Sequence, residues 1–500
     1  MSGKLDEYFP TLRGIPAAWR GLRWLARKTW KASLALLVLL IIAHIALNIY
    51  AGYRLEGELE KIRAAGDPLT LREAAPPKVP NAQNAALVYM QALQHFKTER
   101  DEKEDPENRT IRRFIGEFRY DEEPRSTLAE VEPILAKHAE DFRLLKQASL
   151  MPACSFSVNW EDPVKADLSH LSWMRIAASF LAAKAIADAR RGQSAAALED
   201  FAVIVRMANH VAPEPDLVAQ LARFRFFHYI HLTLPEVLSA ALPNPAKARR
   251  FTDLLRQVDL VDPYVGALKG ERCRQIFVYN LIRRDGPMTL LWLTQPIGTP
   301  QEQRSLPSRA LNALLKPLFQ PFLKLDEIWL LKAMEEQIGL APKSYAQLPR
   351  AVQPAHPGPG QTEGPVDEQW DHIPGYAVVA RIMMPVFSRA MSRRDETKAE
   401  LGLTQLALAL KSFQLEHGEY PASLSELSAA GWSLPADPFS GQPFVYRREG
   451  KGYLLYSIGP DLADSGGLDQ KAAIRKTVEF SQKGKFYDET QYDITFRMTR

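Results

Sequence analysis

The sequence LSWMRIAASFLAAKAIADARRGQSAAALEDFAVIVRMANHVA, residues 171–212, decides the fold class of this chain. Its apolar residues recur three and four positions apart, which is the period of an amphipathic helix. The first run of small and apolar residues stops at Gly192, a residue type that commonly ends a helix. A second run begins at once with Ala195, Ala196 and Ala197, which are small enough for two helices to approach closely. The stretch therefore predicts a helical hairpin.

The same period continues on both sides of this hairpin, from Asn81 to about residue 347. With Gly192 at its turn, the hairpin resembles one tetratricopeptide-like unit, although no second copy follows at the 34-residue period of that repeat. The resemblance implies a helical, solenoid-like middle domain over residues 81–347. Surfaces of this kind usually bind other proteins.

The N-terminal region predicts a membrane anchor. Residues 32–50, ASLALLVLLIIAHIALNIY, contain no charged residue and extend about 28 Å as a helix, close to the roughly 30 Å of a bilayer core. The run is longer than the apolar region of a typical signal peptide and ends without a small-residue cleavage site. We therefore expect a transmembrane helix over residues 32–51, with lipid as its partner. His44 and Asn48 lie toward its outer end, where polar groups reach the interface.

The charge of the N-terminal tail predicts the orientation of the chain in the membrane. The tail of residues 1–31 holds seven basic and two acidic residues, so the positive-inside rule puts it in the cytoplasm. The chain beyond it, beginning with a stalk over residues 52–80, is expected in the periplasm of a bacterium, anchored in the inner membrane. Since the net charge is +4, the remainder is near −1 and lacks the basic face of a nucleic-acid binder.

Two cysteines and two histidines are the candidates for redox or metal chemistry. Cys154 and Cys273 have no CxxC partner and no nearby histidine, so we expect either inert thiols or one structural disulfide. His228 and His231 are three residues apart and share one helix face, but a zinc site needs a third ligand and no HExxH pattern surrounds them. We expect this histidine pair to pack between helices.

No GxSxG, P-loop or GxGxxG pattern occurs in the sequence. The expected function is therefore not enzymatic. The alternative is an envelope hydrolase whose site is assembled from scattered acids such as Glu199, Asp200 and Glu214.

Residues 286–335 contain unusually apolar stretches with interleaved lysines. Two interpretations stay open: a buried core, which we favour, or a membrane surface near the anchor. The aromatic residues concerned are Trp292, Phe319, Phe322 and Trp329. Residues 348–374 follow, and their density of proline and glycine predicts a linker and a domain boundary.

Residues 375–500 predict an α+β domain. A long helix is expected to end near His417 with Gly418 as its cap. The runs FVYRR and GYLLYSI are then typical of two strands joined by a short turn, which makes a hairpin. A last strand, DITFRM, closes the small antiparallel sheet.

This order of a long helix, a Tyr-Pro turn, an Asp-Pro-hydrophobic-x-Gly-x-Pro loop and three strands resembles the globular domain of the type II secretion major pseudopilin (protein G). The resemblance covers about residues 395–500. The matching residues are Tyr420, Pro421, Leu424, Leu427, Asp437, Pro438, Gly441, Pro443, Tyr446, Tyr453, Tyr456, Ser457, Gly459 and Asp461.

In that family the loop after the hairpin binds calcium through carboxylates and carbonyl groups. The resemblance implies a calcium site made by Asp461 and Asp464 of this loop and Asp493 before the last strand, with Asp469 at a further matching place. Calcium takes six to eight oxygen ligands at about 2.3–2.6 Å. An ordinary Asp/Gly turn is the open alternative, because the segment 472–492 is longer than the family pattern.

The N-terminus departs from that family. Pseudopilins carry a prepilin peptidase site, with glycine before phenylalanine and glutamate at the fifth mature position. Residues 12–24, LRGIPAAWRGLRW, lack this pattern, and the apolar run has no glutamate. We therefore expect neither cleavage nor polymerisation. The sequence favours a single-pass extracytoplasmic protein that acts as a scaffold or accessory in envelope assembly or secretion by binding other proteins.

Overall fold

The computed structural model describes residues 15–96, 105–117, 125–163, 165–240, 244–287, 289, 306–348, 373–469, 473 and 492–498. The chain is mainly helical and carries a small three-stranded antiparallel sheet near its C-terminus, as the sequence predicted. Residues 1–14 of the predicted tail and 349–372 of the predicted linker lie outside the described residues. The chain divides into two compact units: unit 1 is 1–61 with 279–329, and unit 2 is 62–278 with 330–500.

Unit 1 contains most of helix α1 (Ile15–Ala64). From Thr29 onward α1 is long and apolar enough to cross a membrane, and its most apolar window is not buried within the protein. A helix of this length and composition suits a single-pass anchor or a signal sequence.

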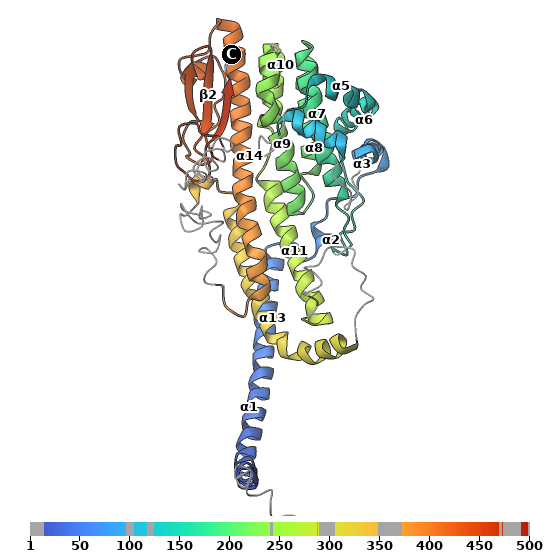
Figure 1. Ribbon diagram of the computed structural model, residues 1–500, viewed down its shortest axis with the longest axis vertical. Helices are drawn as coiled ribbons and strands as arrows, with labels where there is room; N and C mark the ends of the chain where they lie inside the picture. The colour runs from blue at the N-terminus through green and yellow to red at the C-terminus, as the bar shows by residue number, and fades with distance from the viewer. Residues whose placement is uncertain are drawn as a thin grey trace, which may run out of the picture. The chain divides into compact units, whose positions relative to one another are not determined.

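The rest of unit 1 comes from the end of α11 (Asp262–Asp285) and the first part of α13 (Leu306–Leu340). Helix α13 contains Pro317 and Pro321 and bends along its length, as Figure 1 shows. Proline explains such a bend, because it removes a backbone N–H and its ring clashes with the preceding turn.

Unit 2 contains the remaining elements. Its helices, apart from those already named, are α2 (Leu71–Ala74), α3 (Ala85–Leu93), α4 (Pro106–Ile115), α5 (Leu128–Lys137), α6 (Ala139–Ser149), α7 (Ser169–Arg190), α8 (Ser194–Val211), α9 (Leu217–Ala240), α10 (Pro245–Arg256), α14 (Val378–His417) and α15 (Leu424–Ala429). Three 3₁₀ turns are Asn81–Gln83, Gln94–Phe96 and Tyr345–Gln347.

The predicted hairpin is formed by α7 and α8. Gly192 has φ +77° at the turn between them, which a residue with a Cβ adopts only at a cost. Helix α7 packs on both α8 and α9 and is buried around most of its circumference, so it lies in the centre of the helical core. Helix α14 packs on α9 and α10, which brings the C-terminal segment into the same core.

Helix α14 ends at His417, and Gly418 follows with φ +84°, as predicted. The strands are β1 (Val445–Glu449), β2 (Gly452–Ser457) and β3 (Ile494–Met498), in the antiparallel order β1-β2-β3. Strand β2 is buried along its whole length because it is central in the sheet and packs on α14 (Figure 1). Strand β3 packs on both α14 and α9, so the sheet and the helical core are continuous.

Candidate functional site

A pocket of about 370 Å³ opens in unit 2 where three segments meet: the residues around α2, the loop between α8 and α9, and the start of α11. Prolines form much of its wall, namely Pro68, Pro213, Pro215 and Pro263. Its polar side chains are Glu214, Asp259, Asp262 and Lys269. The volume is near the lower limit of ligand pockets, so the pocket suits one long side chain or a small molecule.

The loop APEPD between α8 and α9 carries the central side chain of this pocket. Pro213 and Pro215 fix φ on either side of Glu214 and so limit the conformations of the loop. Asp216 then caps α9, because its Oδ1 accepts a hydrogen bond from the backbone N–H of Val218 at 2.7 Å. Glu214 is therefore presented by a constrained backbone.

Helix α11 holds this loop from the other side. A Cβ added to Gly270 would lie 1.9 Å from the carbonyl oxygen of Pro215, so only glycine permits this approach. One turn further along the helix, Arg274 forms an ion pair with Asp216. The floor of the pocket thus depends on a direct contact between backbones.

Glu214 is 5% exposed. Its Oε1 accepts a hydrogen bond from His170 Nε2 at 2.8 Å, and the ring of Phe156 stacks on His170 with centroids 4.1 Å apart. Its Oε2 is buried, and the described part of the chain offers it no donor. Leaving a buried polar atom unpaired costs about 1–3 kcal/mol, and more for a charged group. A ligand that donates to Oε2 would recover this energy.

The other charges make the pocket acidic. Lys269 is already paired with Asp67, which also accepts from Arg272 Nη2 at 2.7 Å. Burial raises the pKa of Asp67, but the hydrogen bonds from Lys269 and Arg272 outweigh it and lower this pKa overall. Because the charge of Lys269 is compensated, the carboxylates of Glu214, Asp259 and Asp262 dominate the charge of a mostly apolar lining.

Both cysteines are free thiols, so the alternative of a structural disulfide is wrong. Burial, with Glu214 nearby, raises the pKa of the Cys154 thiol to about 12. Burial also raises the pKa of Cys273 to about 12, and its Sγ donates to the carbonyl of Pro68 at 3.2 Å. Neither thiol is a thiolate nucleophile at neutral pH.

The acids of the hydrolase alternative do not gather in one place. Asp200 accepts from Lys184 Nζ at 2.9 Å, and Glu199 accepts from Arg206 Nη1 at 3.0 Å. From Asp200 to the end of α8 the helix rises about 16 Å, and Glu214 lies beyond that end. The structure gives these acids separate partners rather than a shared site.

His228 packs between two helices, as expected, whereas His231 packs against a strand. His228 Nδ1 lies 2.6 Å from Glu400 Oε1, which joins α9 to α14. His231 is buried, and its ring forms a T-shaped pair with the ring of Phe496 on β3, with centroids 5.8 Å apart. The partner of His228 is 172 residues away in the sequence and gives no local signal.

The three aspartates of the predicted calcium site accept hydrogen bonds from strand β2 and from the loop that follows it. Asp464 accepts from the hydroxyl of Tyr456 at 2.9 Å, and Asp493 accepts from the backbone N–H of Gly467 at 2.7 Å. Asp461 accepts from a backbone N–H two residues further on, at 3.3 Å. Among the described residues, no group of three or more His, Cys, Asp or Glu could hold a metal ion. Calcium binding stays a prediction.

No protein-family model, no curated protein and no solved structure matches this chain. The function is therefore argued from the site. Sequence reasoning named Glu214 but missed His170 and the pocket. The motif Pro-Glu-Pro was the available signal, because prolines flanking one acid fix how it is presented.

Proposed function

We propose that this chain is a membrane-anchored scaffold that binds other proteins, and that the pocket around Glu214 receives a basic side chain of the partner. The observation that carries the proposal is the buried carboxylate of Glu214: His170 holds one oxygen, and the other faces no donor in the described chain. The non-enzymatic character expected from the sequence belongs to the same proposal.

A lysine or arginine side chain fits this pocket on two counts. Its apolar stem suits walls of proline, and its charged head donates to a carboxylate. A neutral ligand would bring no positive charge to a lining whose carboxylates are Glu214, Asp259 and Asp262. A bare divalent cation would need more oxygen ligands than the described residues bring together.

The C-terminal module supports a partner in secretion or envelope assembly. Ser457 Oγ donates to Asp437 Oδ1 at 2.7 Å, and Tyr446 donates to the carbonyl of Pro421 at 2.7 Å. These contacts join residues that carry the resemblance to the pseudopilin domain. We propose that the chain lies in the bacterial inner membrane with residues 1–31 in the cytoplasm and its bulk in the periplasm.

The test uses the full chain in lipid nanodiscs and peptides that differ at one position, which is Lys, Arg, Gln or Glu. We expect the Lys and Arg peptides to bind. Glu214→Gln keeps an oxygen for His170 but loses the charge, and it should weaken binding about 30-fold or more, since truncating a buried charge pair costs about 2–5 kcal/mol. Glu199→Gln, which removes an acid from α8 outside this pocket, is the matched control. Equal binding by Glu214→Gln and the wild type would refute the proposal.

The proposed topology has its own test. Protease added to intact spheroplasts should digest the chain beyond residue 51 and spare an epitope tag placed before residue 31. Protection of the C-terminal part would show that the orientation is wrong.

A further inference from the structure

The first part of α13 exposes an apolar face. Four large side chains spaced three and four residues apart lie on one side of this helix. Their exposed fractions are 46%, 67%, 53% and 43% for Leu311, Leu314, Leu318 and Phe322. Phe319 is exposed as well, so the favoured interpretation of a buried core is wrong for Phe319 and Phe322. Trp329 is half-buried, and Trp292 lies outside the described residues.

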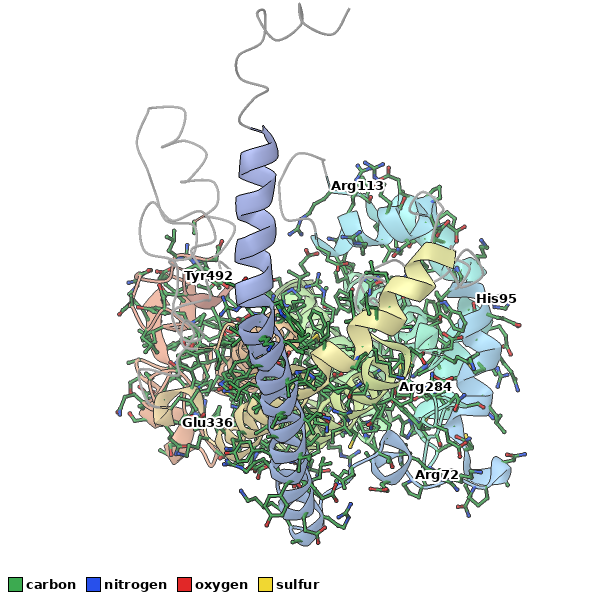
Figure 2. The ribbon with its side chains drawn as sticks, turned by 90° about the horizontal axis from the view of Figure 1, so that it is seen from below. Arg72, His95, Arg113, Arg284, Glu336 and Tyr492 are labelled. Atoms are coloured by element: carbon green, nitrogen blue, oxygen red, sulfur yellow. The ribbon has the colours of Figure 1, made fainter. Side chains whose placement is uncertain are left out.

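The opposite side of this helix is polar and has partners. Asn312, Lys316 and Gln320, four residues apart, donate to the carbonyl groups of residues 283–285 at the end of α11, the last two at 2.8 and 3.0 Å. These carbonyls have no donor within their own helix. Arg284, labelled in Figure 2, lies at this end of α11. The rotation of α13 about its axis is thereby fixed, with its apolar face turned away from α11.

Helix α13 contacts α1 at the bend. Pro321 has no N–H, so the carbonyl of Pro317 lacks its helical donor. His44 Nε2 donates to this carbonyl at 3.0 Å, and Lys324 Nζ donates to the backbone carbonyl of Asn48 at 3.2 Å. Backbone groups at membrane depth must be satisfied by protein, and these contacts provide that.

The contact with His44 fixes the depth of α13 relative to the end of the predicted span. His44 lies seven residues before the predicted end of the span at Ala51, or about 10 Å along α1. Interfacial helices are buried about 5–10 Å into the boundary between headgroups and acyl chains. Figure 1 shows the first part of α13 running across the axis of α1. Position and direction both match a helix that lies in the plane of a bilayer.

We infer that residues 306–322 form an in-plane membrane helix whose apolar face, Leu311, Leu314, Leu318 and Phe322, contacts the lipid of the outer leaflet. Lipid is the occupant that the contacts favour, because α13 meets α1 within the apolar run of α1 itself. The inference rests on the membrane anchoring proposed for α1. The chain is then held at two points, which restricts how unit 1 tilts on the membrane.

The experiment places a spin label at one position at a time on the full chain in nanodiscs. Leu314→Cys and Leu318→Cys test the face, Leu39→Cys reports on α1, and Leu150→Cys is an equally exposed leucine of unit 2. The unmodified chain gives the background from its two native thiols. Oxygen, which concentrates in lipid, should relax the labels at 314, 318 and 39 several-fold more than a water-soluble nickel complex does. The label at 150 should show the reverse.

Three results would overturn the inference. Nickel access at 314 and 318 with lipid exposure at 39 would leave the anchor in place and put α13 in water. Shielding of 314 and 318 from both reagents would show that a protein or a second copy covers the face. Nickel access at 39 as well would refute the anchoring of α1 together with this inference.

Discussion

Phe496 joins the sheet to the helical core, and replacing it with alanine should destabilise both. The side chain is 1% exposed on β3. Its ring stacks on Tyr453 of β2 with centroids 6.4 Å apart and forms a T-shaped pair with His231 of α9 at 5.8 Å. Phe496→Ala removes both ring contacts and leaves a cavity between the two parts.

The expected cost is about 3–5 kcal/mol, the range for a buried phenylalanine cut to alanine. Aromatic pairs of this kind contribute about 0.5–1.5 kcal/mol beyond burial, so two lost contacts favour the upper half of the range. Native proteins are stable by about 5–15 kcal/mol, and the loss is therefore a large share of the total. Arg497→Ala is the matched control, because its neighbouring side chain is half exposed and such changes usually stay within about 0.5 kcal/mol.

The assay is thermal unfolding of the full chain, combined with amide hydrogen exchange. Phe496→Ala should lower the midpoint clearly and Arg497→Ala hardly at all. Amides of β1–β3 and of α9 should lose protection together, since one core holds both. If only the strands lost protection while α9 kept it, the sheet would be an independent module and the reasoning would be wrong.

Three further changes test other contacts. Gly270→Ala should lower the melting temperature and weaken the binding of basic peptides, because the added Cβ would collide with the carbonyl of Pro215. Gly339→Ala is the control: its Cβ would enter open space, so neither the melting temperature nor peptide binding should fall. Burial raises the pKa of Glu400, but His228 and other cations outweigh it and lower the pKa to about 2. Its contribution to stability is therefore complete above about pH 4.5 and lost as the pH falls toward 2, so Glu400→Gln should flatten the acid side of a plot of melting temperature against pH. Millimolar calcium should raise the melting temperature relative to chelator, and Asp464→Asn should abolish that shift; coincident wild-type curves would leave the aspartates as turn formers.

The sequence predicted those parts of the fold that local signals determine. Gly192 and Gly418 end α7 and α14 because each takes a positive φ just beyond the helix. Gly450 also has a positive φ, and it allows the tight turn between β1 and β2. The strands follow from runs of β-branched and aromatic residues. In each case the residue type and its immediate neighbours carry the information.

Contacts between distant segments could not be predicted in this way. The pairing of His228 with Glu400 spans 172 residues, and the pocket combines three segments that share no pattern. Apolar composition also failed to show that Phe319 and Phe322 are exposed, because a core and a lipid-contacting surface look alike in the sequence. Both environments select large apolar side chains, and only the packed neighbours tell them apart.

His44 and Glu214 are both polar groups in apolar surroundings, but only His44 is satisfied by the described part of the protein, and this difference bears on function. His44 in the apolar run and Pro321 in a helix are each unfavourable alone, but Pro321 leaves the carbonyl of Pro317 without its helical donor and His44 donates to that carbonyl. Both groups are satisfied by this hydrogen bond, so a structural role is enough to explain them. Glu214 is also a buried polar group, yet one of its oxygens has no donor in the described chain. A buried polar group without a donor costs stability unless a ligand supplies one. For that reason the proposed binding function rests on Glu214, whereas His44 has a structural role.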